Sequence, residues 1–214
     1  MTAIKASFDG TVSTYDYYGT GSTINRNTEE GETAVDEAIA YLQAANPATD
    51  LVWSSGLFLA STDHVEDITH DLSPTDYGSD GSSPLDRARD YGDYGKYTNH
   101  VKQYMYLGRD SALNIVLQMV IDDDDSTRRR RSNIFSTFNT QLGLAQNYHT
   151  LYGNSNVFMF GGVEYETDEP YSYCSTPFWA ELSTSSASNT PGSATQIATH
   201  VIQLLGLTLL VLSN

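Results

Sequence analysis

The chain has 214 residues and a formal net charge of -16, which suits one domain with extensions. So negative a surface repels phosphate groups and excludes nucleic-acid binding, whereas cationic partners fit it better. The fifteen tyrosines would also suit a carbohydrate surface as partner, although half-buried loop tyrosines are the plainer alternative.

Cys174 is the single cysteine, so no disulfide within the chain can form and the fold must depend on packing. The first residues lack the apolar stretch of a secretory signal, so we expect either a protein that is not exported or a precursor start that the sequence does not record. No Asn-x-Ser/Thr site is present, so N-glycosylation is not expected.

Residues 1–28 form a tyrosine-rich N-terminal extension with a weak strand signal over residues 11–18. Apolar residues then recur at spacings of three and four over residues 29–45, which predicts an amphipathic helix that ends before Asn46 and Pro47.

Two further helices are predicted downstream. One begins after Ser83, with Pro84 at its first position and Ser82 or Ser83 as its cap. The other runs from about residue 54 to about residue 71, and the side chains expected on its buried face are Leu57, Leu59, Ala60 and Val65.

The most apolar predicted helix covers residues 111–121 and is followed by four aspartates at 122–125. Acids oppose the dipole at the end of a helix, so these aspartates need cationic partners, and the arginines at 128–131 are candidates. We expect the arginine run to be a solvated loop that contributes about 0 to 1 kcal/mol per ion pair. Strands are predicted at residues 141–145 and 156–160, separated by a turn at Gly153 and Asn154.

The composition changes after Tyr165. Residues 166–195 comprise an acidic, aromatic segment and a Ser/Thr-rich linker, and residues 196–214 form an apolar tail. The tail is shorter than the about 20 residues that cross a bilayer. It could be the signal for a GPI-type membrane anchor, but the favoured interpretation is a contact between subunits.

Four stretches occur in an order known from one family: residues 51–53, 78–89, 115–123 and 132–135. In this order they resemble the CAP superfamily of cysteine-rich secretory, antigen-five and pathogenesis-related proteins, in a cysteine-poor form. The resemblance places a CAP-like domain at residues 29–165. It implies an α+β fold, an α-β-α sandwich with a small antiparallel sheet between helices.

Many members of this family surround a cavity with two histidines and two acidic residues that can bind a divalent metal. By resemblance, the first histidine position is Asp76, the first glutamate is Gln103, the second histidine is Arg130, and the second acid is Asp122 or Asp123. A guanidinium cannot coordinate a metal, so we expect no metal and no cofactor. Arg130 should instead pair with Asp76 or with an aspartate of the 122–125 run.

Two other histidines are candidate replacement ligands, His149 and His100. For each of them the simpler interpretation is a turn histidine that hydrogen-bonds to the backbone.

These observations predict no catalytic residue. They favour a non-enzymatic structural or interaction protein, located outside the cell or on its surface, that forms homo-oligomers or filaments through its extensions. One alternative is a metal-dependent hydrolase-like protein using Asp76, Asp122, Asp123 and His149, and another is a lipid-binding secreted CAP protein.

Overall fold

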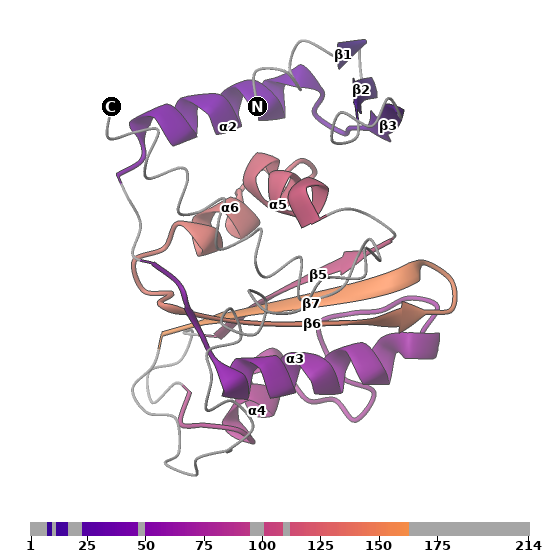
Figure 1. Cartoon of the computed structure of the whole chain (residues 1–214), viewed down its shortest axis with the longest axis vertical. Helices are drawn as coiled ribbons and strands as arrows, with labels where there is room; N and C mark the ends of the chain where they lie inside the picture. The colour runs from indigo at the N-terminus through magenta and orange to yellow at the C-terminus, as the bar shows by residue number, and fades with distance from the viewer. Residues whose placement is uncertain are drawn as a thin grey trace, which may run out of the picture.

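The computed structural model describes residues 8–9, 12–16, 23–46, 50–94, 101–108 and 112–162. The predicted segments at 166–195 and 196–214, together with His100, lie outside the described residues. Within the described part, the chain is an α+β protein built in layers (Figure 1). No helix in these ranges is long and apolar enough to cross a membrane.

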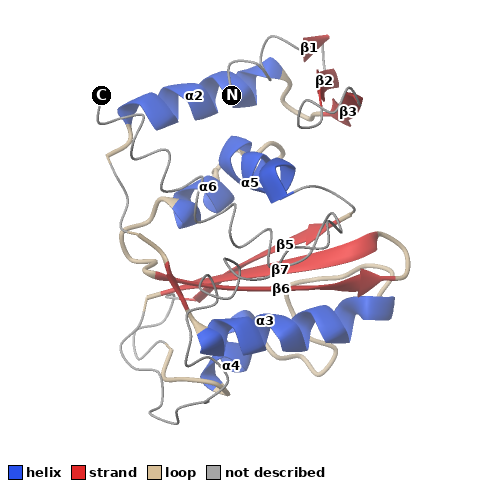
Figure 2. Cartoon of the chain, in the orientation of Figure 1, coloured by secondary structure: helices blue, strands red, loops and turns tan. Residues whose placement is uncertain are grey.

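The layers follow the predicted sandwich (Figure 2). Helices α5 (Ala112–Ile121) and α6 (Arg129–Ile134) cover one face of the main sheet, and α2 (Glu32–Ala44) lies over them. Helices α3 (Ser55–Asp67) and α4 (Pro84–Arg89) cover the other face. The short 3-10 helix η1 (Ile68–His70) continues α3.

The main sheet has the strand order β4-β6-β7-β5. The long strands β6 (Gln141–His149), β7 (Gly153–Gly161) and β5 (Val101–Leu107) pair antiparallel, as expected, whereas the two-residue strand β4 (Val52–Trp53) pairs parallel to β6. The turn between β6 and β7 covers residues 150–152, so placing it at Gly153 and Asn154 was wrong: Gly153 has a φ of 86° and begins β7. Strand β5 was not predicted.

A second, separate sheet lies at the N-terminal end of α2 (Figure 1). It consists of β1 (Phe8–Asp9), β2 (Val12–Asp16) and β3 (Thr23–Asn27), all antiparallel. Strand β2 confirms the strand predicted within residues 11–18. Among the described strands, β1 to β3 pair only with one another.

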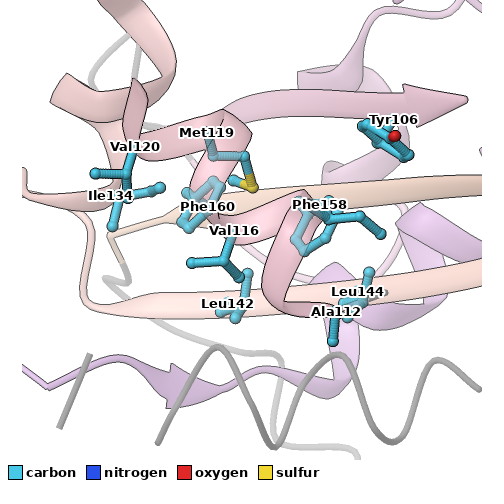
Figure 3. Close-up of a cluster of buried hydrophobic side chains, with 11 residues drawn as sticks. Tyr106, Ala112, Val116, Met119, Val120, Ile134, Leu142, Leu144, Phe158 and Phe160 are labelled. Carbon is cyan, nitrogen blue, oxygen red and sulfur yellow. The ribbon is translucent and has the colours of Figure 1, made fainter. Parts of the chain in front are cut away.

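The sheet separates two hydrophobic clusters. Because successive side chains of a strand point to opposite faces, β6 and β7 supply residues to both. On the α5 side, Val116 and Met119 of α5 pack against Phe158 and Phe160 of β7 (Figure 3). On the α3 side, the cluster comprises Leu57, Ala60, Val65, Ile68, Ala88, Tyr94, Ala145, Val157 and Met159.

Helix α3 lies very close to the sheet at Gly143. A Cβ at this position would lie 2.2 Å from the backbone carbon of Leu57, so a side chain here would push the helix away. The helix begins just after its cap Ser54, which confirms the predicted start at about residue 54, and its buried residues are Gly56, Leu57, Ala60, Ser61, His64 and Val65. The prediction for Leu59 was wrong, because this residue is only half-buried.

Helix α4 confirms the predicted start and resolves the alternative for its cap. The Ser83 hydroxyl accepts a hydrogen bond from the Asp86 amide at 3.2 Å, and the Asp86 carboxylate accepts one from the Ser83 amide at 2.9 Å. This reciprocal capping box satisfies amides that have no partner within the helix.

Candidate functional site

The predicted cavity positions do not converge on one cavity. Gln103 and Tyr104 are neighbours in β5, so their side chains point to opposite faces of the sheet. Tyr104 packs in the cluster on the α5 side, and Arg130 of α6 lies over its ring at 5.2 Å. Gln103 contacts Arg87 of α4 on the other side. Strand β5 therefore separates Gln103 from Arg130.

Asp76 and Gln103 do come together, around a residue that sequence reasoning missed. Arg87 is 5% exposed, and its Nη2 donates to the carbonyl of Asp76 at 2.9 Å and to Oε1 of Gln103 at 2.8 Å. Gln103 Nε2 in turn donates to Oδ1 of Asp76 at 3.0 Å. The first histidine and first glutamate positions of the resemblance thus hold a hydrogen-bonded pair that encloses a guanidinium.

His64 joins this group from α3. Its Nε2 lies 3.0 Å from the carbonyl oxygen of Thr75, which can only accept, so Nε2 carries the hydrogen. The ring is buried, and burial lowers the pKa of His64, with the positive charge of Arg87 lowering it further. His64 is therefore held neutral beside Arg87.

Together these side chains fasten the loop of residues 71–83 to α3 and α4. Arg87 Nη1 donates to the carbonyl of Ser82 at 2.8 Å, and the Asp67 carboxylate accepts from the amide of Ser79 at 2.7 Å and from its hydroxyl. Loop carbonyls at residues 75, 76 and 82 are held by buried donors. We call His64, Asp76, Arg87 and Gln103 the Arg87 cluster, and its geometry is that of a structural clamp.

A second polar group lies at the junction of α5 and α6. Asp122 is fully buried, and its Oδ2 accepts from the amides of Arg130 at 2.8 Å and Arg131 at 3.1 Å, at the first turn of α6. Burial raises the pKa of Asp122, against these amide hydrogen bonds and the charge of Arg130, which lower it. The carboxylate thus closes the start of α6 although it lies outside that helix.

Arg131 does the opposite at the end of α5. It is 2% exposed, and its Nε and Nη2 donate to the carbonyls of Val120 and Ile121, each at 2.6 Å. These carbonyls belong to the last turn of α5, where a cation is favourable. The prediction of a solvated arginine loop was therefore wrong. It considered only the charged side chains nearby, whereas the acceptors of the buried Arg131 are backbone carbonyls.

Arg130 forms ion pairs with Oδ1 of Asp122 at 3.2 Å and with Oδ1 of Asp124 at 2.8 Å. Of the two expected partners, the structure therefore shows the aspartates of the 122–125 run, and Asp76 lies on the other side of the sheet. The aspartates that follow α5 and Arg130 of α6 thus neutralise one another locally.

Asp123 and Arg128 extend this group to α2. The Asp123 carboxylate accepts from the amides of Glu29 at 2.8 Å and Glu30 at 2.9 Å, just before α2 begins. Arg128 pairs with Glu30, and with Oε2 of Glu37 at 2.6 Å, which lowers the pKa of Glu37. We call Asp122, Asp123, Arg128, Arg130 and Arg131 the arginine cluster, and it joins three helices.

His149 lies apart from both clusters, at the end of β6. It is buried, and its Nδ1 accepts from the amides of Leu151 at 3.1 Å and Tyr152 at 3.3 Å. The simpler interpretation, a turn histidine bound to the backbone, is thus what the structure shows. In the part of the chain that the structure describes, no three His, Cys, Asp or Glu side chains gather so as to hold a metal ion.

Comparison with known proteins gives little similarity. No protein-family model matches the sequence, and no curated protein does. Among solved structures, the chain is similar to an outer surface protein from Borrelia burgdorferi, with 17% sequence identity and a TM-score of 0.44 over 64% of this chain and 96% of that one. The function of this chain is therefore inferred from its own residues.

Proposed function

We propose that this chain is a non-enzymatic CAP-type protein, displayed outside the cell or on its surface, that self-assembles through the regions outside its core. The observation that carries the non-enzymatic part is the division of the predicted cavity residues by strand β5. A metal or an acid and base pair must act on one substrate from one cavity, and here Gln103 and Arg130 lie on opposite faces.

The chemistry of the two clusters supports the same conclusion. Arg87 and Arg130 occupy their centres, and a guanidinium neither coordinates a metal nor exchanges protons near neutral pH. Asp76, Asp122 and Asp123 accept hydrogen bonds from amides or side-chain donors of the protein itself. Their carboxylates therefore stabilise the fold, whereas the carboxylates of an enzyme active site would face a substrate.

The N-terminal sheet supports self-assembly. In the strand order β1-β2-β3, the five-residue strand β3 lies at an edge, where its outward amides and carbonyls can pair with an added strand. An edge of this kind in a segment outside the main core provides a contact without disturbing that core. The apolar residues 196–214 are the second proposed contact, on sequence grounds.

Light scattering on the full chain tests the assembly. We expect particles larger than a monomer, and smaller particles after deletion of residues 1–28 or 196–214. A full chain that stays monomeric at high protein concentration would contradict self-assembly.

Calorimetric titration with Zn²⁺ and Ca²⁺ tests the non-enzymatic part against the metal-dependent alternative. We expect no heat of binding that Asp76→Ala or Asp122→Asn removes. Stoichiometric binding that disappears in either variant would overturn the proposal, because it would show that the Asp76 or Asp122 carboxylate of the native protein binds a cation.

A further inference from the structure

Helix α2 depends on partners that are distant in sequence. Its N-cap residue, Gly31, offers no side chain for capping, and the turn just before the helix is held by Asp123, whose bonds to the amides of Glu29 and Glu30 span 94 and 93 residues. Arg128, which pairs with Glu37, is 91 residues from it. A short isolated helix is marginal in water, so α2 needs the surface of α5 and α6 to be stable.

The apolar part of the same contact is small. Only Ala34, Val35 and Ala38 of α2 are buried. Leu42 packs against the cluster on the α5 side, and the Tyr41 ring lies edge-on to Phe135 at 5.4 Å between centroids. The docking of α2 therefore combines a narrow apolar stripe with opposite charges.

The charges make this contact specific for α2. The whole chain carries 27 acidic and 11 basic residues, so two copies repel each other over most of their surface. Arg128 and Arg131 are an exception, because they pair with Glu30, just before α2, and with Glu37 of α2. An acidic helix identical to α2 is thus the element of a second copy that fits this surface best.

The connection after α2 permits such an exchange. Ala45 leaves the helix in an extended conformation, with φ of -67° and ψ of 136°. In the sequence, Pro47 follows, and a proline also keeps the residue before it, Asn46, extended. An extended connection lets a terminal element reach a neighbouring molecule, whereas a tight turn would fold it back.

From these contacts we propose that α2, with β1 to β3 attached, is exchanged between copies, so that α2 of one copy docks on α5 and α6 of another. This inference rests on the proposed self-assembly and names its element and its surface. Every contact of α2 is reproduced in the exchanged state, so the balance between the two states depends on the connection and on protein concentration.

Cross-linking between two singly labelled chains tests the exchange. In a Cys174→Ser background, one chain carries Tyr41→Cys and the other Phe135→Cys. The two are mixed in urea, refolded together at high concentration and treated with a short bis-maleimide. We expect a covalent dimer, because Tyr41 and Phe135 meet between molecules when α2 is exchanged.

Two controls make the result decisive. Tyr41→Cys mixed with Leu72→Cys measures random collision, since Leu72 is 75% exposed and follows η1 beneath the sheet. A single chain with both Tyr41→Cys and Phe135→Cys shows that the two sites can be linked. We expect the dimer yield of the 41 and 135 mixture to exceed that of the 41 and 72 mixture several-fold.

Equal yields in the two mixtures, or failure of the doubly substituted chain to be linked, would overturn the exchange. If light scattering shows assembly of the full chain and the yields are equal, copies associate by another contact and the proposed function stands. If the full chain is monomeric, the proposed function fails as well.

Discussion

Replacement of Arg131 by methionine removes the charge that closes α5 and keeps most of the side-chain volume. Two hydrogen bonds from the guanidinium to the carbonyls of Val120 and Ile121 are lost, each at 2.6 Å in the native protein. Hydrogen bonds to charged groups contribute about 1.5 to 3 kcal/mol each. Because Arg131 is 2% exposed, water does not readily replace the lost donors, and we expect a loss of about 3 to 5 kcal/mol in the free energy of unfolding.

Arg129→Met is the matched control. This neighbour is 79% exposed and pairs with Asp125 at 2.7 Å on the protein surface, so its replacement should cost about 0 to 1 kcal/mol. Urea unfolding followed by circular dichroism gives both values. A difference between the two variants of less than about 1 kcal/mol would refute the reasoning that burial and backbone capping distinguish the two arginines.

Three further outcomes are expected from the same unfolding assay. Gly143→Ala should destabilise the protein by about 1 to 3 kcal/mol or more, because the new methyl group meets the backbone of α3, and an unchanged stability would show that the helix lies farther from β6. Ser83→Ala should cost about 1 kcal/mol and Ser83→Thr much less, since threonine also caps; equal losses would argue against the capping box. Burial lowers the pKa of His64 from 6.5, so the unfolded chain takes up a proton before the folded one does, and stability should fall as the pH falls below about 6.5. His64→Gln should show a weaker decrease between about pH 7.5 and about pH 5.5, and a decrease as large as that of the native protein would assign it to other groups.

The helices could be predicted because their signals are local. Periodic apolar residues indicated α2, α3 and α5, and the Ser83 cap indicated α4. Strand β5 gave no such signal, because most of its side chains are only partly buried on both faces of the sheet. Helix α6 was missed since its three arginines suggested a solvent-exposed loop, whereas Arg131 is buried and donates to backbone carbonyls of α5.

The two clusters divide in the same way. His149 could be recognised as a turn histidine because the amides it binds are two and three residues away. Arg87 could not be recognised, since the groups it binds come from a loop and from β5 and include backbone carbonyls, which are the same for every residue type. That Gln103 and Arg130 lie on opposite faces follows from the alternation of side chains along β5. This alternation could not be used in the sequence analysis, because β5 was not predicted.

The distant partner of the turn before α2 has a consequence for the chain during its synthesis. Asp123 leaves the ribosome about 94 residues after Glu29, which at about 5 to 20 residues per second corresponds to a delay of roughly 5 to 20 s. During that interval the amides of Glu29 and Glu30, just before the helix, lack their Asp123 partner, because it has not yet been synthesised. On a messenger carrying several ribosomes, the chain on the leading ribosome already contains Asp123. A following chain that has only reached its own Glu29 and Glu30 therefore meets the Asp123 of its neighbour before its own has been synthesised.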